Sequence, residues 1–175
     1  MFITYQQTSE QSYLLNYGED INIITNKKVI SHFKYLIKNK FEYIFNVVPS
    51  FNKLLIVYDT NFKEDVEILI KNLKLIKEYN EINSTQHLIP ICYDEEYALD
   101  YKNVENAFSI NFDKFINLHS STNFNVFMIG FMPGLPFLGL LNIHKSLPRL
   151  ENPRISVPAG SVGVVDNLSV IYPNQ

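Results

Sequence analysis

The sequence predicts an α+β domain, residues 1–84, followed by a mainly β domain, residues 85–175. In the first part, short extended runs alternate with two amphipathic helical segments, which is the pattern of a small α+β layer. A polar stretch, residues 78–86, is the predicted linker. Beyond it, residues 130–163 hold five of the six glycines and five of the eight prolines, which disfavours helix and indicates short strands joined by structured loops.

The first domain opens with two short extended runs, residues 2–7 and 12–17, which predict a hairpin or two neighbouring strands. The next segment has apolar residues at helical spacing. Val29, Leu36 and Ile37 fall on one face of this predicted helix, and we expect that face to pack on the sheet.

Two more β-rich runs, residues 42–50 and 52–59, complete the expected sheet. A second helix is predicted to begin at Asn61, whose side chain would cap it together with Glu64 three residues later. Its inner face would start with Phe62 and continue at helical spacing.

The second domain begins with an apolar run, residues 87–93. Two short amphipathic helices are predicted over residues 100–108 and 111–119. A strand at residues 124–131 leads into the region rich in glycine and proline. Regular alternation returns only at residues 161–173, where further short strands are expected.

The composition excludes several classes of protein. The net charge of -3 gives no electrostatic reason to expect a nucleic acid or an anionic membrane as partner. The single cysteine, Cys92, excludes an internal disulfide framework and fits a reducing compartment. The N-terminus lacks the pattern of a secretory signal, and no apolar run approaches the length of a membrane span. We therefore expect a cytoplasmic protein.

The sequence contains no recognised motif for a metal or a nucleotide. Its four histidines show no ligand spacing, and no acidic cluster of the calcium-loop type is present. There is also no phosphate loop and no glycine-rich dinucleotide fingerprint. We expect no metal site and no ATP site within this chain.

Arginine usage marks the candidate functional centre. The chain has thirteen lysines but only Arg149 and Arg154, and both fall within residues 130–163. A planar guanidinium grips a carboxylate or a phosphate with two hydrogen bonds, which lysine cannot do. Either arginine could instead form a structural ion pair, with Glu151 or Asp166 as the nearest acidic candidates.

Three blocks of this region carry a specific resemblance. GFMPGLPFLG, LPRLENPR and SVPAGSVGVV, in this order and spacing, resemble the signature of the family that contains the 5-oxoprolinase B subunit, the Kip-type inhibitor of sporulation histidine kinase and allophanate hydrolase subunit 1. The upstream LHSSTNFNVFMIGF and the closing VIYP extend the match. The two-part layout of the family covers essentially the whole chain.

The resemblance implies a cyclophilin-like β-barrel for the second domain. It also implies a subunit of a heteromeric, ATP-dependent 5-oxoprolinase, a hydrolase that opens the lactam of 5-oxoproline to glutamate. A homologous cyclophilin-like C subunit and a separate A subunit would be its partners, ATP would enter through the complex, and this chain alone would be inactive. Two alternatives stay open: a non-enzymatic inhibitor that binds a histidine kinase, and a carboxyltransferase-like subunit of a biotin-dependent urea-type system.

The chain departs from the family pattern in two places. Residues 94–100 read DEEYALD where the family carries a glycine-rich segment, so Glu96 and Asp100 match while three glycines and a proline are missing. The family pattern also continues beyond the Tyr-Pro at residues 172–173. From this we expect a C-terminally truncated, incomplete barrel.

Seven residues are the candidate site. Glu96 and His119 are expected to move protons, and the substrate-binding candidates are Arg149, Arg154, Gly134, Ser161 and Phe137. Each has a plainer interpretation. Glu96 could lie in a solvated acidic loop, and His119 could be a hydrogen-bonded wall residue or a charge at a helix end. Gly134 could simply form a turn, Ser161 could be a hydrogen-bond donor, and Phe137 could line a pocket or belong to the core.

Overall fold

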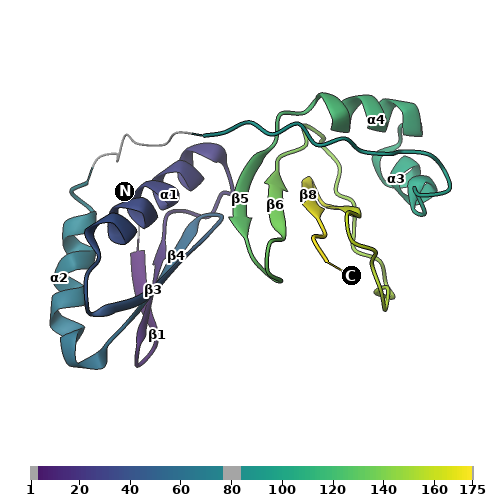
Figure 1. Cartoon of the computed structure of the whole chain (residues 1–175). Helices are drawn as coiled ribbons and strands as arrows, with labels where there is room; N and C mark the ends of the chain where they lie inside the picture. Colours follow the sequence, from purple (N-terminus) through teal and green to yellow (C-terminus); the bar gives the residue numbers. More distant parts are fainter. Residues whose placement is uncertain (1–3, 77–83, 175) are drawn as a thin grey trace. The chain divides into compact units, whose positions relative to one another are not determined.

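The computed structural model describes residues 4–76 and 84–174 and divides the chain into two compact units, Met1–Ser84 and Thr85–Gln175. Most of the predicted linker, residues 78–83, lies outside the described residues. Each unit contains one four-stranded antiparallel sheet and two α-helices (Figure 1). In the part of the chain that is described, no helix is both long enough and apolar enough to span a bilayer.

The first sheet is built from two hairpins. Its strands are β1 (Thr4–Ser9), β2 (Ser12–Asn16), β3 (Ile44–Ser50) and β4 (Lys53–Tyr58), in the order β1-β2-β4-β3. The helix α1 (Ile23–Asn39) connects β2 to β3, and α2 (Lys63–Leu73) follows β4 after the short 3-10 helix η1 (Thr60–Phe62). All strand pairs are antiparallel.

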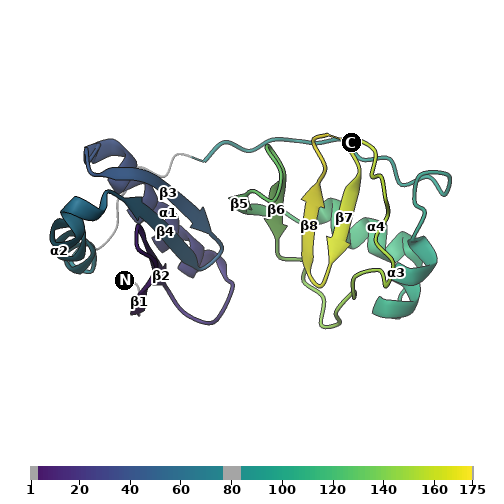
Figure 2. The same cartoon turned by 90° about the horizontal axis from the view of Figure 1, so that it is seen from below.

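One face of this sheet packs against both helices (Figure 2). Alternation along β4 explains which face: Leu54, Ile56 and Tyr58 are fully buried, and the residues between them are only partly covered. The helices contribute their own apolar stripes. The buried core of this unit consists of Tyr13, Leu15, Tyr17, Val29, Leu36, Val47, Leu54, Ile56, Tyr58, Val66, Leu69, Ile70 and Leu73.

Two predictions about the ends and faces of these helices are wrong. The cap after β4 is Asp59 and not Asn61, because the Asp59 carboxylate accepts the backbone N–H of Asn61 at 3.0 Å and α2 starts only at Lys63. Ile37 and Phe62 were expected on inner faces but are 52% and 42% exposed. Phe62 is instead stacked on Tyr43, with the ring centroids 5.5 Å apart.

Two stacked tyrosines in this core give a test of the packing. Tyr13 donates its hydroxyl to Glu67 Oε1 at 2.5 Å, whereas the buried Tyr58 hydroxyl has no hydrogen-bond partner among the described residues. Their rings lie 5.4 Å apart at 13°. We expect Tyr58→Phe to raise the free energy of unfolding by about 1 kcal/mol, because it removes an unsatisfied buried hydroxyl, and Tyr13→Phe to lower it by about as much. Urea unfolding measures both, and equal destabilisation by the two variants would contradict this account.

The second unit begins with two helices and continues with the second sheet. The irregular segment 84–93 leads to a turn and then to α3 (Tyr101–Phe108) and α4 (Phe112–Ser121). The strands are β5 (Asn125–Ile129), β6 (Pro136–Gly139), β7 (Val162–Val165) and β8 (Leu168–Ile171), in the order β5-β6-β8-β7. The two helices stack through the rings of Phe108 and Phe115, 5.9 Å apart.

The cyclophilin-like barrel that the resemblance implies is not confirmed. The strands that the structure describes in residues 84–174 form a single open sheet, with β5 and β7 at its two edges. The observed architecture of this unit is α+β, two helices followed by a four-stranded antiparallel sheet, and not the mainly β one that was expected. The apolar run at residues 87–93 has no regular secondary structure, and Leu88 is 92% exposed.

Candidate functional site

The hairpin between β5 and β6 contains the first of the three sequence blocks, GFMPGLPFLG. Its turn is closed by a hydrogen bond from the Gly130 N–H to the Leu135 carbonyl at 3.0 Å. Gly134 has φ of 84°, a conformation that favours glycine, so this residue is a turn former. Phe131 also has a positive φ, 70°, and its side chain is exposed at the tip of the hairpin.

Three of the expected site residues come together near the end of β8. A Cβ placed on Gly134 would lie 3.5 Å from the Cβ of Pro173. Ser161 accepts the N–H of Tyr172 at 2.9 Å through its backbone carbonyl. Phe137 pairs with Val170 across the β6–β8 ladder. Gly134, Phe137 and Ser161 therefore all lie next to the closing VIYP segment, residues 170–173.

Between β6 and β7 the chain forms an exposed strap, residues 148–157, without helix or strand. One end of the strap is fixed where Leu147 accepts the Asp166 N–H at 2.8 Å, and the other where Pro158 accepts the Ser161 N–H at 3.1 Å. All its side chains are exposed except that of Val157, which is half-buried. Both arginines of the chain lie on this strap.

Arg154 binds Asp100 through two parallel hydrogen bonds. Nη1 donates to Oδ2 at 2.8 Å and Nη2 to Oδ1 at 2.9 Å, which is the bidentate geometry expected of a guanidinium and a carboxylate. Asp100 raises the pKa of Arg154 above its ordinary value through this hydrogen bond. The alternative of a structural ion pair is thus realised, but with Asp100 and not with Glu151 or Asp166.

Arg149 differs from Arg154 in its surroundings. Its side chain is exposed, and the structure gives it no hydrogen bond and no ion pair among the described residues. Asp166, one of its suggested partners, instead accepts a hydrogen bond from Ser146 Oγ. Of the two arginines, Arg149 is the one whose guanidinium is available to an anionic ligand.

The segment 94–100 forms a tight turn where the resemblance implies a glycine-rich segment. The Asp94 carbonyl accepts the N–H groups of Tyr97 and Ala98 at 2.9 and 3.0 Å. None of these residues has a positive φ, which agrees with the loss of the glycines. Glu96 is exposed on this turn, four residues before Asp100.

His119 is enclosed in the core of the second unit. Only 3% of its surface is exposed, and both ring nitrogens are engaged: Nδ1 with the Tyr93 hydroxyl at 2.7 Å and Nε2 with the Ser169 hydroxyl at 2.8 Å. Phe115 and Phe124 pack against the ring, with centroids 5.6 and 5.1 Å away. Burial lowers the pKa of His119 below its ordinary value, so the imidazole is neutral at pH 7.

His119 and Phe137 lie on opposite faces of the second sheet. Ser169, which contacts His119, and Val170, which pairs with Phe137, are adjacent in β8, and adjacent strand residues point to opposite faces. The structure thus separates the seven candidates into three places: the end of β8, the strap with the facing turn, and the core beneath α4.

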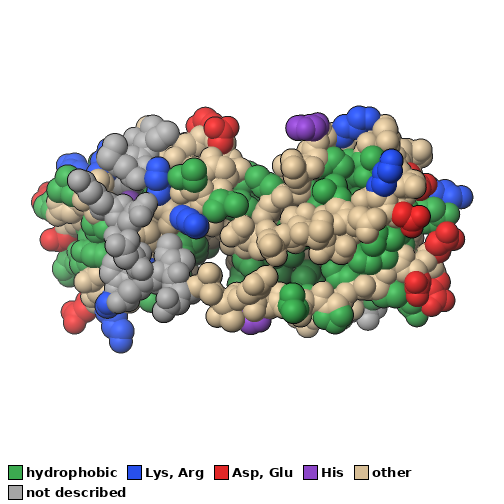
Figure 3. Space-filling view, turned by 90° about the horizontal axis from the view of Figure 1, so that it is seen from above, with side chains coloured by type: hydrophobic (Ala, Val, Ile, Leu, Met, Phe, Trp, Pro, Cys, Tyr) green, Lys and Arg blue, Asp and Glu red, His purple; other side chains and the backbone are tan. Residues whose placement is uncertain are grey.

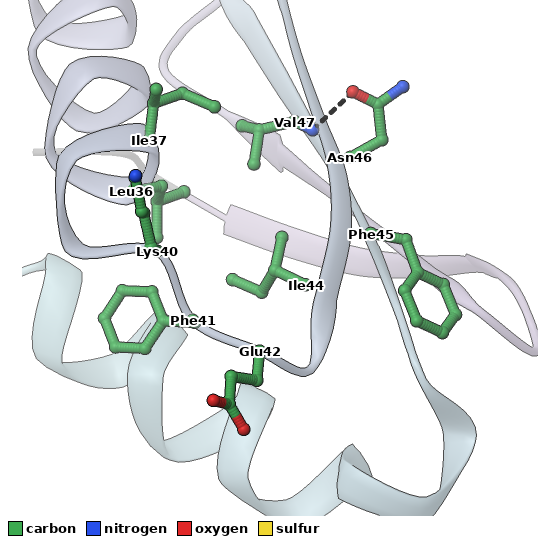
Figure 4. Close-up of a pocket in the computed structure, with 9 residues that line it drawn as sticks. All are labelled: Leu36, Ile37, Lys40, Phe41, Glu42, Ile44, Phe45, Asn46 and Val47. Atoms are coloured by element: carbon green, nitrogen blue, oxygen red, sulfur yellow. Dashed lines mark hydrogen bonds between the residues drawn. The ribbon is translucent and has the colours of Figure 1, made fainter.

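The described residues contain no group of three or more His, Cys, Asp or Glu side chains that could hold a metal ion. A cavity of about 370 Å³ lies in the first unit, between the end of α1 and β3 (Figure 4). Leu36, Ile44 and Val47 form its apolar wall, with Lys40 and Glu42 at the rim. None of the seven candidate residues lines it.

Sequence reasoning missed the partners of these residues. Tyr93 and Ser169 fix His119, although they lie 26 and 50 positions away in the chain. Nothing in their local sequence marks them as partners. Asp100 was visible as a match to the family pattern, but its pairing with Arg154 spans 54 positions and was not foreseen.

Comparisons with known proteins cover nearly the whole chain. The family model described as "Carboxyltransferase domain, subdomain C and D" matches residues 3–175. The 5-oxoprolinase B subunit of Bacillus subtilis (strain 168) is 30% identical over an alignment of 191 positions, which covers 99% of this chain and 78% of the relative. The 5-oxoprolinase B subunit of Haemophilus influenzae is 34% identical over 133 residues, 74% of this chain and 62% of the relative. These matches lend no support to the expected C-terminal truncation.

Solved structures share the fold. TTHA0988 superposes on 94% of this chain with a TM-score of 0.80 and 26% identity, and this chain spans 32% of its length. The urea carboxylase of Kluyveromyces lactis superposes on 96% of this chain with a TM-score of 0.71, and this chain spans 17% of its length. At 16% identity the second likeness concerns the fold alone.

Proposed function

Since this chain belongs to the family of the carboxyltransferase domain, subdomain C and D, we propose that it is a subunit of a heteromeric 5-oxoprolinase that opens the 5-oxoproline lactam to glutamate. The observation that carries the proposal is the alignment with the Bacillus subtilis protein, which takes in 99% of this chain at 30% identity. Two further relatives with the same name support it. A kinase inhibitor and a urea-type carboxyltransferase are not favoured, because none of these three relatives is named as either.

The complex would contain a homologous C subunit and a separate A subunit, and would work in the cytoplasm. A lactam is a stable amide, and coupling to ATP would supply an activated carbonyl. No phosphate loop is present in this sequence, so we assign ATP to another part of the complex. We also propose that residues 85–175 correspond to the cyclophilin-like part of the family.

Within this chain, Arg149 is the best-supported ligand contact, because its guanidinium is exposed and unpaired among the described residues. It would hold a carboxylate or a phosphoryl group. Gly134, Phe137 and Ser161 would form a second, separate contact near the end of β8. Glu96 is solvent-accessible and could exchange a proton. His119 would act chiefly by holding α4 on β8, since both its nitrogens are already bonded.

The proposed function predicts that activity requires the partner subunits. We expect the isolated chain to release little glutamate from 5-oxoproline and ATP, and the chain mixed with the A and C subunits to release it robustly. The measurement is glutamate formation with and without ATP. Robust turnover by the isolated chain would contradict the assignment to a heteromeric enzyme. If the complex assembles but releases no glutamate, the assignment of 5-oxoproline as the substrate is wrong.

Arg149→Lys should impair the assembled enzyme while leaving the fold intact. Lysine keeps the positive charge but cannot donate two parallel hydrogen bonds to one anion. The loss of one charge-assisted hydrogen bond costs about 1.5 to 3 kcal/mol, which is roughly ten- to a hundred-fold in kcat/KM. The exposed Lys145→Arg serves as a matched control a few residues away. If Arg149→Lys is as active as the wild type, Arg149 contacts no ligand in the reaction.

A further inference from the structure

The two parallel hydrogen bonds between Arg154 and Asp100, which we call the fork, join the strap to a packed helix. Asp100 stands directly before α3, and its carbonyl accepts the Val104 N–H at 3.1 Å. Val104 and Phe108 of this helix are buried in the core of the second unit, where Phe108 stacks on α4. The packing of α3 therefore fixes the backbone of Asp100, whereas the strap is exposed and has no regular secondary structure.

The turn that leads to Asp100 is also fixed at its other end. Tyr93, the residue before the turn, is hydrogen-bonded through its hydroxyl to Nδ1 of the buried His119 at 2.7 Å. Nε2 of His119 is in turn bonded to the Ser169 hydroxyl of β8 at 2.8 Å. The Asp100 carboxylate is thus presented by a segment that is tied to the sheet on one side and to α3 on the other.

The Asp100 carboxylate bonds the strap and not its own helix. Asp100 occupies the N-cap position of α3, where an aspartate side chain ordinarily accepts a backbone N–H of the first helical turn. It makes no such cap hydrogen bond, and its two oxygens accept from Arg154 at 2.8 and 2.9 Å. Asn111, at the N-cap of the neighbouring α4, does cap its helix by accepting the Lys114 N–H at 3.0 Å. The contrast indicates that the Asp100 side chain serves to hold the strap.

The fork lies at the surface, so its main effect is local. Charged side chains of both signs reach the surface on the face shown in Figure 3. The side chains of Arg154 and Asp100 are themselves 36% and 39% exposed. An exposed ion pair contributes little to the stability of a whole domain, but the bidentate geometry fixes how the two groups are oriented. We therefore expect the fork to order the strap without carrying the stability of the unit.

The fork divides the strap into two shorter pieces. Backbone hydrogen bonds fix the strap only at its ends, at Leu147 and at Pro158. With Arg154 also held, Arg149 lies on a run of chain that is tied down at both Leu147 and Arg154. A shorter, tied segment has fewer conformations to lose when one of its side chains binds a ligand.

We propose that Asp100 and Arg154 are positioning residues for an oxyanion site at Arg149. By holding the strap on the N-terminus of α3, the fork limits the positions open to the Arg149 guanidinium before it grips a carboxylate or phosphoryl oxygen. This role rests on the proposed function, which supplies the ligand. Asp100 and Arg154 act through Arg149 and need not touch that ligand.

The test uses the assembled enzyme, with KM and kcat measured for both 5-oxoproline and ATP. Asp100→Asn and Arg154→Lys should each raise one of the two KM values about three- to fivefold and leave kcat within about twofold. A higher KM for 5-oxoproline assigns the substrate carboxylate to Arg149, and a higher KM for ATP assigns a phosphoryl group. If neither KM changes, the fork positions nothing in the reaction and the proposal is wrong.

Asp113→Asn is the matched control for Asp100→Asn. Asp113 is an exposed carboxylate in the first turn of α4 and has no ion pair with a described lysine or arginine. The control removes the same charge near the same end of a helix without releasing the strap, so both KM values should stay as in the wild type. Hydrogen exchange in residues 148–157 should be faster in Asp100→Asn than in the wild type or in Asp113→Asn. Unchanged exchange would show that the fork does not order the strap.

A double-mutant cycle distinguishes positioning from a general structural role. In the Arg149→Lys background, Asp100→Asn should raise the affected KM by less than about 1.5-fold, because no bidentate grip is left to position. A fork that only stabilises the fold would have the same effect in both backgrounds, and that result would overturn the proposal.

The outcomes also separate this inference from the proposed function. If the wild-type complex releases glutamate while the fork variants keep wild-type KM values, the inference fails and the proposed function stands. If Arg149→Lys itself leaves both KM values unchanged, Arg149 is no ligand contact and the inference again fails alone. If the assembled wild-type complex releases no glutamate, the proposed function fails and the inference fails with it.

Discussion

Replacing His119 with alanine is expected to lower the free energy of unfolding of the second unit by about 3 kcal/mol or more. The substitution leaves a cavity among Phe115, Phe124 and Tyr93, and cavities left by large buried side chains cost about 3 to 5 kcal/mol. It also leaves the fully buried Ser169 hydroxyl without its partner. Chemical unfolding followed by near-UV circular dichroism measures the loss.

His144→Ala is the control for this change, because His144 is an exposed histidine of the same unit. It should alter the free energy of unfolding by less than about 0.5 kcal/mol. A loss of less than about 1 kcal/mol for His119→Ala would mean that the hydrogen bonds to Tyr93 and Ser169 contribute little. In the assembled enzyme, activity should fall only in step with the folded fraction if His119 is structural.

The same histidine predicts how stability depends on pH. Burial lowers the pKa of His119 in the folded chain below 6.5, its ordinary value, so the unfolded chain binds the proton more readily. The stabilisation is therefore complete above about pH 6.5 and is lost as the pH falls toward the folded pKa. His32, buried in the first unit against Tyr17, has its pKa lowered in the same direction. Removing His119 should flatten this dependence for the second unit only.

Gly139→Ala is expected to have the second large effect, a loss of about 3 kcal/mol or more of stability. A Cβ on Gly139 would lie 2.5 and 2.8 Å from two ring carbons of Phe127 and 3.0 Å from Leu168. Phe127 is only 1% exposed, so its ring has no room to move aside, and overpacking of this kind forces the strands apart. Thermal unfolding of the variant measures the effect.

Gly160→Ala is the matched control. Gly160 has φ of 82°, so alanine is strained there, but an added Cβ would meet no described atom within 4 Å. We expect it to lose only about 1 kcal/mol. If the two alanine variants are equally destabilised, backbone strain and not the contact with Phe127 governs the second sheet.

Local sequence patterns predicted which helices and strands form better than they predicted where each one begins or which of its residues are exposed. The alternation in residues 52–59 places Leu54, Ile56 and Tyr58 on one buried face, and the structure confirms a strand there. The predicted cap, Asn61, was wrong, because Asp59 and Asn61 are both plausible cap residues and only the backbone geometry selects Asp59, as the cap of η1. The exposure of Ile37 was likewise invisible to helical spacing.

The candidate site was predictable as a region but not as a set of contacts. Because both arginines lie within residues 130–163, the sequence predicted a functional centre in the region that contains the strap. Which acidic residue meets Arg154 depends on how the turn at residues 94–100 approaches the strap, and that approach is set by tertiary packing. The hydrogen bonds that fix His119 depend on the same kind of long-range contact.

The order β5-β6-β8-β7 also bears on how the second unit folds. β5 pairs with β6 and β7 with β8 across short turns, so each hairpin closes a small loop. The β6–β8 ladder joins the hairpins only after the chain between Gly139 and Val162, including the strap, has been closed, and loop closure costs more entropy as the loop lengthens. We expect the hairpins to form early and their docking to limit the folding rate. The strap that carries both arginines then belongs to the loop whose closure we expect to limit the folding rate.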